Sequence, residues 1–327
     1  MKAAWYQKNG TAREVLVVGE MPTPEPGPGE VRVRLHVSGA NPSDVKSRRG
    51  RPLAFPRIVP HSDGAGIIDA VGRGVGTGRV GERVWVWNGQ WKRAGGTAAE
   101  YVVLPEAQVV TLDDNTDFDA GACMGIPGLT AVQAVRLTGS CVGKTILVTG
   151  AAAAVGHYVT QIATLRGARV IGTTSAARAD HARAAGAAEV IDYKAEDVAA
   201  RVKELTGGRG ADAIIDMDFS STAKLLPEGV LAPHGKLVCY GSNVAADVPL
   251  NFPAMLWSSL TVQMFLVYEL TLADRAATIG DLQGLLHEGR LKHTIGARYP
   301  LDAIAEAHEA IEGGKVIGNV VVDVRSA

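Results

Sequence analysis

The chain has 327 residues, of which 46% are hydrophobic and 20% charged, and its formal net charge is −1. This length exceeds the size at which a single hydrophobic core keeps growing, so two domains are expected. The balanced charge lacks the basic excess of nucleic-acid-binding proteins and argues against such a partner. The three scattered cysteines are too few for a disulfide framework or a cysteine-rich zinc lobe.

No targeting or membrane segment is indicated. The first residues lack the apolar core of a signal peptide. The longest apolar run, residues 260–268, is too short to cross a bilayer and is interrupted by Thr261 and Gln263. We therefore expect a soluble, cytoplasmic protein with no membrane partner.

The first part of the chain is predicted to be rich in β-structure. Between residues 31 and 37, Val and Leu alternate with Arg and His, which is typical of a half-buried strand. Residues 39–51 predict a loop that opens a short helix, with Ser43 as the N-cap after Pro42. Further strands are expected within residues 1–20, 58–86 and 101–104.

An apolar helical stretch at 119–137, broken at 125–128, precedes a change of pattern at Lys144, after which strands and helices alternate. Strands are predicted at 146–149, 168–172, 189–191, 213–216, 237–240 and 260–267, and helices at 155–166, 176–185, 196–205, 222–231, 273–288 and 302–312, before a last strand at 318–324. This order predicts an α/β protein in which a doubly wound, Rossmann-type parallel sheet is inserted into a discontinuous β-rich domain. The predicted boundaries are 1–124 with 267–327 for the β-rich domain, and 125–266 for the other.

Residues 144–178 carry the strongest functional pattern. An apolar strand at 146–149 is followed by a turn on Gly150 and a row of alanines, then by a helix and a second strand. Such a βαβ unit binds a dinucleotide pyrophosphate at the helix N-terminus. Of the three positions of a G-x-G-x-x-G frame, only Gly156 is glycine, so a turn without a ligand remains an alternative.

The end of the second strand indicates which dinucleotide is bound. NAD-specific sites place Asp or Glu there to hold the ribose 2′-hydroxyl. Here Thr173, Thr174 and Ser175 lead to Arg178, with no carboxylate among them. Hydroxyls and a guanidinium suit a 2′-phosphate, so NADP(H) is favoured over NAD(H).

Several segments together resemble one family over essentially the whole chain. They include Pro60-His-Ser-Asp-Gly-Ala-Gly, Val80-Gly-Glu-Arg-Val and Gly125-Ile-Pro-Gly-Leu-Thr-Ala, with residues 26–34, 39–44, 96–103, 148–156, 190–193 and 318–322. In this order and spacing they resemble the zinc-independent medium-chain dehydrogenases/reductases of the NADPH:quinone oxidoreductase, or zeta-crystallin-like, group. The resemblance implies that the β-rich domain is a GroES-like catalytic domain.

The same resemblance bears on metal binding. Zinc-using relatives would carry Cys at Asn41 and His at Ser62, and both ligands are missing here. His61 lies one place away and is interpreted either as a catalytic group or as a hydrogen-bonded structural histidine. We expect no metal, which disfavours metal-assisted alcohol oxidation.

The resemblance also implies the site residues. Asn41 and Thr130 would flank the nicotinamide and its ribose and position them, and we identify no essential acid. The other cofactor contacts implied are Ala153, Ala154 and Val155 at the pyrophosphate turn, Ser175, Arg178 and Tyr193 with Thr173 around the 2′-phosphate, Gly241, Ser242, Phe265 and Val267 after later strands, and Asn319, where many relatives have Lys. Tyr193 as a cap over the sheet edge and Arg178 as a solvated charge remain alternatives.

The implied reaction is hydride transfer to a conjugated acceptor, which does not require a protein acid. By position, the residues lining the acceptor cleft are Asn41, Asp44, Lys46, Arg51, His61 and Trp87. The acceptor is predicted to be a quinone, and an enone, alkenal or enoyl-thioester is the alternative. A third hypothesis is an NADPH-bound binding protein with little turnover. By resemblance we expect a homodimer in which strands 260–267 of two copies pair, since a bare apolar edge would promote aggregation.

Overall fold

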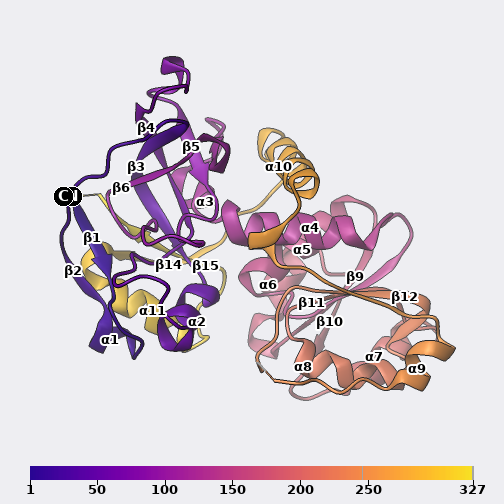
Figure 1. Cartoon of the computed structure of the whole chain (residues 1–327). Coiled ribbons are helices and arrows are strands. Elements are labelled where there is room, and N and C mark those ends of the chain that lie inside the picture. The colour runs from indigo at the N-terminus through magenta and orange to yellow at the C-terminus, as the bar shows by residue number, and fades with distance from the viewer. Residues whose placement is uncertain (245, 326–327) are drawn as a thin grey trace. The chain divides into compact units, whose positions relative to one another are not determined.

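The computed structural model describes residues 1–244 and 246–325, and the chain forms two compact units (Figure 1). The first unit comprises residues 1–126, 286–289 and 293–327, and the second comprises 127–285 and 290–292. The predicted boundary at 266/267 therefore differs from the observed division. Helix α10 (Leu272–His287) lies mostly in the second unit because it packs on α4 (Leu129–Thr138), where Thr278 donates a hydrogen bond to Gln133 over 2.8 Å.

The first unit is built on a mixed seven-stranded sheet with the order β14-β15-β3-β4-β5-β7, in which β6 also pairs with β3. Its strands are β3 (Glu30–Ala40), β4 (Asp63–Val71), β5 (Arg83–Val86), β6 (Tyr101–Pro105), β7 (Val109–Thr111), β14 (Ile295–Pro300) and β15 (Asn319–Asp323). A separate ribbon pairs β1 (Lys2–Trp5) with β2 (Val17–Glu20). The helices are α1 (Ala12–Val15), α2 (Pro42–Gly50), α3 (Phe118–Gly121) and α11 (Ile304–Glu312).

The alternation predicted for β3 is confirmed. Val31, Val33 and Leu35 are buried in the core of the first unit, whereas Arg34 between them is exposed. Burying every second side chain fixes the register of the strand, because a slip by one residue would turn the valines outward. This β-rich unit and the parallel sheet described next confirm the predicted fold class.

Two predicted details of the first unit are wrong, and one strand was missed. The N-cap of α2 is Asn41 rather than Ser43, because Pro42 has a fixed φ and no N–H and so occupies the first turn itself. Val15, expected in a strand, ends helix α1. Strand β14 was not predicted, since its residues 295–300 carry too few apolar side chains for a clear alternation.

The second unit is a six-stranded parallel sheet with the order β10-β9-β8-β11-β12-β13. Its strands are β8 (Thr145–Val148), β9 (Arg169–Thr174), β10 (Glu189–Asp192), β11 (Ala211–Asp216), β12 (Leu231–Cys239) and β13 (Thr261–Met264). Helices α4 and α5 (Ala154–Leu165) cover one face, and α7 (Val198–Leu205) and α8 (Phe219–Thr222) the other (Figure 1). The unit also contains α6 (Ala179–Ala184) and α9 (Phe252–Trp257). The strand order reverses between β8 and β11, which is where ligands bind in such sheets.

The helix predicted at 222–231 is wrong in its second half. Helix α8 gives way to a 3-10 segment, Ala223–Glu228, that contains Pro227. Gly229 then adopts a φ of 76°, and β12 begins at Leu231. The strand expected at 260–267 spans only Thr261–Met264, and α9 was not predicted.

Two glycines make the turn after β8 possible. Gly150 has a φ of 65°, which favours glycine, and a side chain there would meet the sulfur of Met217 at 2.1 Å. A Cβ on Gly156 would lie 2.1 Å from the carbonyl oxygen of Gly150. The third position of the fingerprint is therefore the one at which glycine cannot be replaced, because α5 starts in contact with the turn.

Candidate functional site

The turn between β8 and α5 presents free backbone donors. Ala153 is the N-cap of α5 and offers no side-chain acceptor, so within the described part of the chain no side chain caps the first N–H groups of the helix. Ala151 and Ala152 are buried beneath the turn, whereas Ala153, Ala154 and Val155 are partly exposed. Such an uncapped helix start is suited to an anionic oxygen, and the three residues expected at a pyrophosphate lie there together.

Thr173 supports this turn from β9. Its side-chain oxygen accepts a hydrogen bond from the Gly150 N–H over 3.2 Å, and its carbonyl accepts one from Ala151 over 3.0 Å. The side chain of Thr173 is buried. The structure therefore gives Thr173 the role of holding the turn in place.

The residues expected around a 2′-phosphate follow two neighbouring strands. Ser175 and Arg178 come directly after β9, and Tyr193 comes after β10. The Tyr193 N–H donates to the carbonyl of Thr174 over 3.3 Å, which ties the two strand ends together. The Tyr193 side chain is 55% exposed, and no Asp or Glu stands between the end of β9 and Arg178.

The ends of β12 and β13 place the next set of predicted residues. The Gly241 carbonyl already accepts from the Phe219 N–H, and the Ser242 hydroxyl donates to the Val244 carbonyl. Phe265 donates its N–H to Cys239, and the carbonyl of Val267 accepts from Arg275. The Phe265 N–H and the Val267 carbonyl are thus already used within the protein. A ligand that contacts the backbone of these two residues would bind the Phe265 carbonyl and the Val267 N–H.

Thr130, in the first turn of α4, carries an orphaned polar group. Its side chain is 3% exposed, and its hydroxyl has no hydrogen-bond partner among the residues that the structure describes. Leaving a buried hydroxyl unpaired costs about 1–3 kcal/mol. A ligand that completes this hydrogen bond would remove that cost, which fits a cofactor contact.

In the first unit, Asn41 is held by two buried carboxyl groups. Its side-chain amide donates to Asp63 over 2.9 Å, and its backbone N–H donates to Asp44 over 2.8 Å. Burial raises the pKa of Asp44 to about 7 and that of Asp63 well above its usual value. Sequence reasoning placed Asp44 in the cleft but missed Asp63, whose separation from Asn41 by 22 residues gives no local signal.

His61 is hydrogen-bonded inside the first unit, as the structural interpretation of this residue expects. Its ring is wholly buried, with Nδ1 2.8 Å from the Ser38 hydroxyl and Nε2 2.9 Å from Nε2 of His308 on α11. The His61 backbone has a φ of 73°, a strained value for a residue other than glycine. A side chain fixed at both ring nitrogens is what holds that conformation in place.

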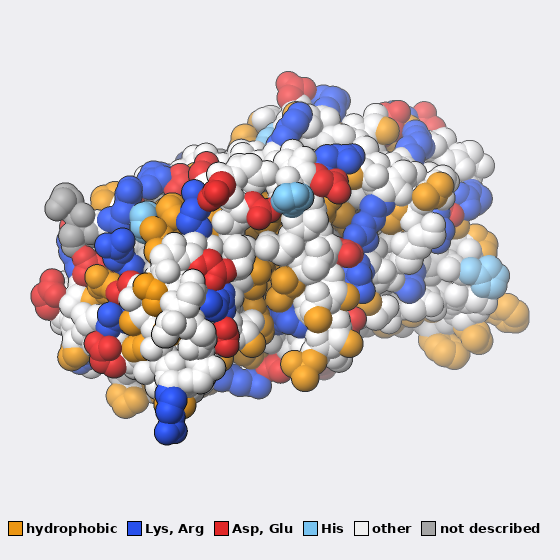
Figure 2. Space-filling model, turned by 90° about the horizontal axis from the view of Figure 1, so that it is seen from above, with side chains coloured by type: hydrophobic (Ala, Val, Ile, Leu, Met, Phe, Trp, Pro, Cys, Tyr) orange, Lys and Arg blue, Asp and Glu red, His pale blue; other side chains and the backbone are white. Residues whose placement is uncertain are grey.

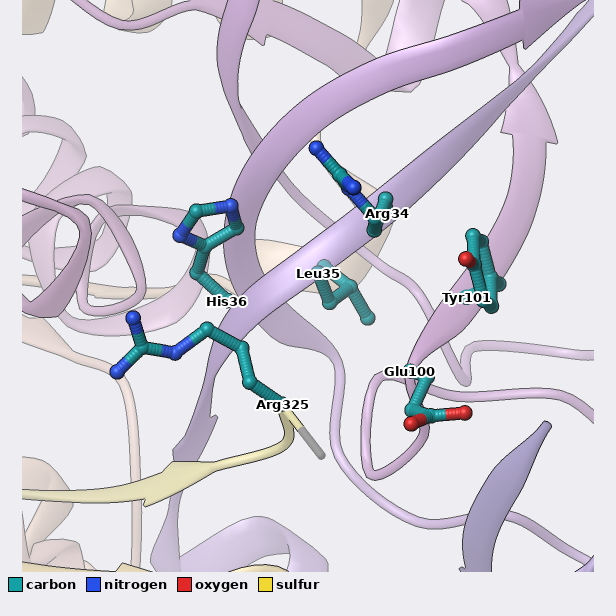
Figure 3. Close-up of a pocket in the computed structure, with 6 residues that line it drawn as sticks. All are labelled: Arg34, Leu35, His36, Glu100, Tyr101 and Arg325. Atoms are coloured by element: carbon teal, nitrogen blue, oxygen red, sulfur yellow. The ribbon is translucent and has the colours of Figure 1, made fainter. Parts of the chain in front are cut away.

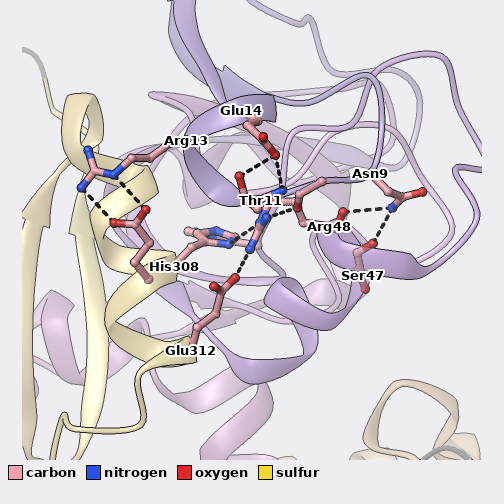
Figure 4. A network of polar contacts seen from close by, with 11 residues as sticks. Asn9, Thr11, Arg13, Glu14, Ser47, Arg48, His308 and Glu312 are labelled. Carbon is pink, nitrogen blue, oxygen red and sulfur yellow. Dashed lines mark hydrogen bonds and ion pairs between the residues drawn. The ribbon is translucent and has the colours of Figure 1, made fainter.

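The hydrogen bonds around His308 run in one direction. Arg48 can only donate, so Nδ1 of His308 accepts a hydrogen bond from it over 3.3 Å (Figure 4). Nε2 of His308 must then carry the ring proton and donate to His61. His61 then donates to Ser38, which donates to Thr97 over 2.8 Å, and Thr97 donates to the carbonyl of Asp63. The series begins at the Arg48–Glu312 ion pair and ends on the residue that holds Asn41.

The remaining predicted residues lie elsewhere in the first unit. Asn319 is buried, and both its backbone and its side-chain N–H groups donate to the carbonyl of Thr294, a structural role within the sheet. The guanidinium of Arg51 lies 5.9 Å from the centre of the Trp91 ring. The basic group expected in the cleft thus stacks on an indole.

A shallow pocket of about 310 Å³ lies on β3 of the first unit, and Figure 3 shows its lining. Arg34, His36 and Arg325 bring like charges together there, and burial together with these two arginines lowers the pKa of His36. The Arg325 guanidinium is paired with Asp323, and Glu100 also lines the pocket. None of the predicted site residues belongs to this pocket.

Basic and acidic side chains are interspersed on the face in Figure 2, which shows no continuous basic stripe among the described residues. This mixed surface agrees with the near-neutral net charge. Within the part of the chain that the structure covers, none of the helices is long and apolar enough to cross a membrane.

Two segments of the chain match known dehydrogenase families. Residues 27–114 match the alcohol dehydrogenase GroES-like domain family, and residues 185–322 match the zinc-binding dehydrogenase family. The human quinone oxidoreductase is 31% identical over 98% of this chain and 97% of its own. The quinone oxidoreductase of Pseudomonas aeruginosa is 35% identical over 94% of this chain and 95% of its own. The chain belongs to the zinc-independent quinone oxidoreductase family of medium-chain dehydrogenases/reductases.

Solved structures agree with membership of this family. One described as an NAD-dependent alcohol dehydrogenase has a TM-score of 0.89 and 33% identity, covering 99% of this chain and all of its own. A mycobacterial protein solved in complex with NADPH has a TM-score of 0.85 and 29% identity, covering 98% of this chain and 99% of its own. The protein is thus an oxidoreductase of the medium-chain dehydrogenase/reductase class.

Among the described residues no three His, Cys, Asp or Glu side chains come together in a group that could hold a metal ion. The three cysteines are buried and unpaired. Burial raises the pKa of Cys239 to about 12, with Asp216 adding to the effect, so its thiol stays protonated near neutral pH. Burial likewise raises the pKa of Cys123 well above its usual value, so this thiol also stays protonated near neutral pH.

Asp216 is a second residue that sequence reasoning missed. It ends β11 beside the point where the strand order reverses, is wholly buried, and accepts hydrogen bonds from the hydroxyls of Thr149 and Thr222. Burial raises its pKa. The sequence offered a signal, because Asp216 is an acidic residue at the end of the apolar strand predicted at 213–216.

Proposed function

We propose that this protein reduces quinones with NADPH as the hydride donor, without a metal. The observation that supports the choice of NADPH is the end of β9, where Ser175 and Arg178 follow the strand and no carboxylate stands between the strand and Arg178, with Tyr193 after the neighbouring β10. A guanidinium pairs with a phosphate, whereas a carboxylate would repel one. The mycobacterial NADPH complex supports the cofactor, and the human and Pseudomonas aeruginosa quinone oxidoreductases support the acceptor.

The neighbour described as an NAD-dependent alcohol dehydrogenase points to a different reaction. Oxidation of an alcohol requires a group that acidifies the hydroxyl, usually a metal ion. In this chain Asn41 and Ser62 stand at the two positions expected for metal ligands, and neither is a thiolate or an imidazole. We therefore favour reduction of a conjugated acceptor over alcohol oxidation.

When bound, NADPH supplies a hydride from C4 of its nicotinamide, and the chain supplies binding and orientation. In the second unit, the N–H groups at the start of α5 would bind the pyrophosphate and the Thr130 hydroxyl would complete its missing hydrogen bond. In the first unit, Asp63 fixes the orientation of the Asn41 amide, which would position the ring. The reduced quinone takes its protons from solvent, so no residue is assigned as an acid.

The first experiment measures NADPH oxidation with matched 1,4-quinones and α,β-unsaturated ketones, repeated with NADH and with a chelator. We expect turnover of quinones that prefers NADPH and is insensitive to the chelator. Turnover of the unsaturated ketones alone would assign the protein to the enone reductases. Tight NADPH binding without turnover of either would favour the binding-protein hypothesis, and loss of activity with chelator would contradict metal independence.

We also propose that the protein is a homodimer formed through β13, and that it is cytoplasmic. Strand β13 pairs with β12 on one side only, so its other edge is open. Exposed apolar side chains precede and follow this strand in the chain, namely Phe252, Leu256 and Trp257 of α9 and Leu266 after β13. A second copy that paired β13 with β13 would cover both the open edge and this surface. Subcellular fractionation tests the location.

A further inference from the structure

A cavity of about 540 Å³ in the second unit lies where β12 and β13 end. Cys239 and Met264, the last residues of these strands, both line it, as does Phe219 at the start of α8. Parallel sheets bind their ligands beyond the carboxyl ends of the strands. The cavity therefore lies at the edge of the sheet where a small molecule is expected, and its volume is within the usual range for such sites.

The lining of this cavity is mostly apolar and partly aromatic. The rings of Phe219, Tyr240 and Phe265 contribute to it, and those of Tyr240 and Phe265 lie 6.4 Å apart, inclined at 52°. Val248 and Met264 add aliphatic surface. Among the described residues of the lining, Asp247 alone is charged, and its side chain is exposed to solvent. Such a lining favours a flat, uncharged ring over an anion or a sugar.

One polar group in the lining has no protein partner. The side chain of Tyr240 is half-buried, and among the residues that the structure describes its hydroxyl forms no hydrogen bond, whereas its backbone N–H donates to the Asp216 carbonyl. Burial raises the pKa of Tyr240, and the nearby Asp216 and Cys239 add to this, so the phenol stays protonated at neutral pH. A tyrosine hydroxyl in such surroundings usually finds a partner. The hydroxyl is thus available as a donor to an oxygen atom of a bound molecule.

We propose that this cavity binds the ring of an aromatic carbonyl compound of the quinone class, and that Tyr240 donates a hydrogen bond to its carbonyl oxygen. The identity of the ligand rests on the proposed function, whereas the cavity and its donor do not. Tyr240 is then a residue that determines which acceptors bind. The cavity adjoins the proposed cofactor contacts Gly241 and Phe265, so the test must separate acceptor from cofactor.

The experiment is equilibrium dialysis of 2-methyl-1,4-naphthoquinone against the full chain, alone and with saturating NADP⁺, which cannot reduce it. Tyr240→Phe removes the donor and keeps the ring, and we expect it to raise the Kd about 3- to 10-fold. Ala246→Trp places a large side chain in the lining, and we expect it to raise the Kd more than about 10-fold, because it fills the cavity. The matched controls are Tyr299→Phe in the first unit and Ala200→Trp on the exposed side of α7, which should leave the Kd unchanged.

Three results would overturn the proposal. The Kd could be unchanged in both variants, or saturating NADP⁺ could abolish naphthoquinone binding, which would assign the cavity to the cofactor. Alternatively, Ala246→Trp could reduce quinones at the wild-type rate, which would leave the proposed function standing without this cavity. By contrast, naphthoquinone bound in the cavity with no turnover by NADPH would contradict the proposed function and support the cavity.

Discussion

The Nε2 atoms of His61 and His308 lie 2.9 Å apart in the interior of the first unit, although 247 residues separate them in the chain. Nε2 of His308 donates and Nε2 of His61 accepts, and because Nδ1 of His308 accepts from Arg48, each ring carries a single proton and is neutral in the folded protein. Burial lowers the pKa of His61 to about 3 and that of His308 well below its usual value, with His61 and Arg48 adding to the effect on His308. The pair joins the segment before β4 to α11 only while both rings are uncharged.

This pair predicts acid sensitivity. Because the folded pKa values lie below the unfolded value of about 6.5, the stability they contribute is present above that pH and is lost as the pH falls. Each histidine changes the free energy of unfolding by up to about 1.4 kcal/mol per pH unit. Asp44, whose pKa is raised, acts in the opposite direction, since its contribution is lost as the pH rises through about 7.

The measurement therefore compares variants. Between pH 6.5 and 5, urea unfolding should show His308→Gln losing about 2 kcal/mol less than the wild type, because one titrating group is gone. His287→Gln, at an exposed position, is the control and should follow the wild type. Parallel curves for His308→Gln and the wild type would contradict the neutral pair.

Thr130→Val tests the orphaned hydroxyl. Valine has nearly the same shape without the polar group, so the cofactor-free protein should be as stable as the wild type or more stable by about 1 kcal/mol. The same change should raise the KM for NADPH several-fold, because the cofactor loses a hydrogen bond. Thermal unfolding and steady-state kinetics measure the two effects, and a destabilised variant would show that the hydroxyl has a protein partner.

Arg178→Ala tests the choice of cofactor. Loss of the guanidinium should raise the KM for NADPH about 10-fold or more and leave that for NADH nearly unchanged, since a charge-assisted hydrogen bond to phosphate contributes about 1.5–3 kcal/mol. Arg183→Ala is a matched control, because Arg183 is exposed and pairs with Asp180 on the surface of α6. Equal losses with the two cofactors would count against a 2′-phosphate site.

Asp63 is predicted to act through Asn41. Asp63→Asn keeps an oxygen that can accept from the Asn41 amide, so we expect a stable protein with most of its activity. Asp63→Leu leaves that amide without a partner and should cost about 1–3 kcal/mol of stability and lower kcat. Equal kcat values in the two variants, measured well below their unfolding temperatures, would remove Asp63 from the positioning of Asn41.

The β13 surface predicts the oligomeric state. Trp257, which is 86% exposed, should be buried between two copies, so Trp257→Glu is expected to shift the protein from dimer to monomer. Val142→Glu introduces the same charge at another exposed apolar position and should leave the dimer intact. Sedimentation velocity distinguishes the states, and a monodisperse wild-type monomer would contradict the proposal.

The sequence predicted most of the elements because their patterns are local. The alternation along β3 and the strand-turn-helix around Gly150 each reflect burial that repeats with the period of one strand or helix. The predicted 222–231 helix failed where local signals competed, since Pro227 and Gly229 interrupt an otherwise helical composition. The cap of α2 was predicted too late, at Ser43 and not at Asn41, because Asn and Ser are both suitable caps and Pro42 occupies the first turn.

By itself, then, the sequence determined the fold class, the βαβ unit and the set of residues that follow each parallel strand, because these depend on neighbours in the chain. Only the tertiary structure decided that Asp63 holds Asn41, that His308 meets His61, and that the hydroxyl of Thr130 is left without a partner. These relationships depend on how distant segments pack. The free energy of a buried polar group depends on which atoms surround it, and no periodicity in the chain records that.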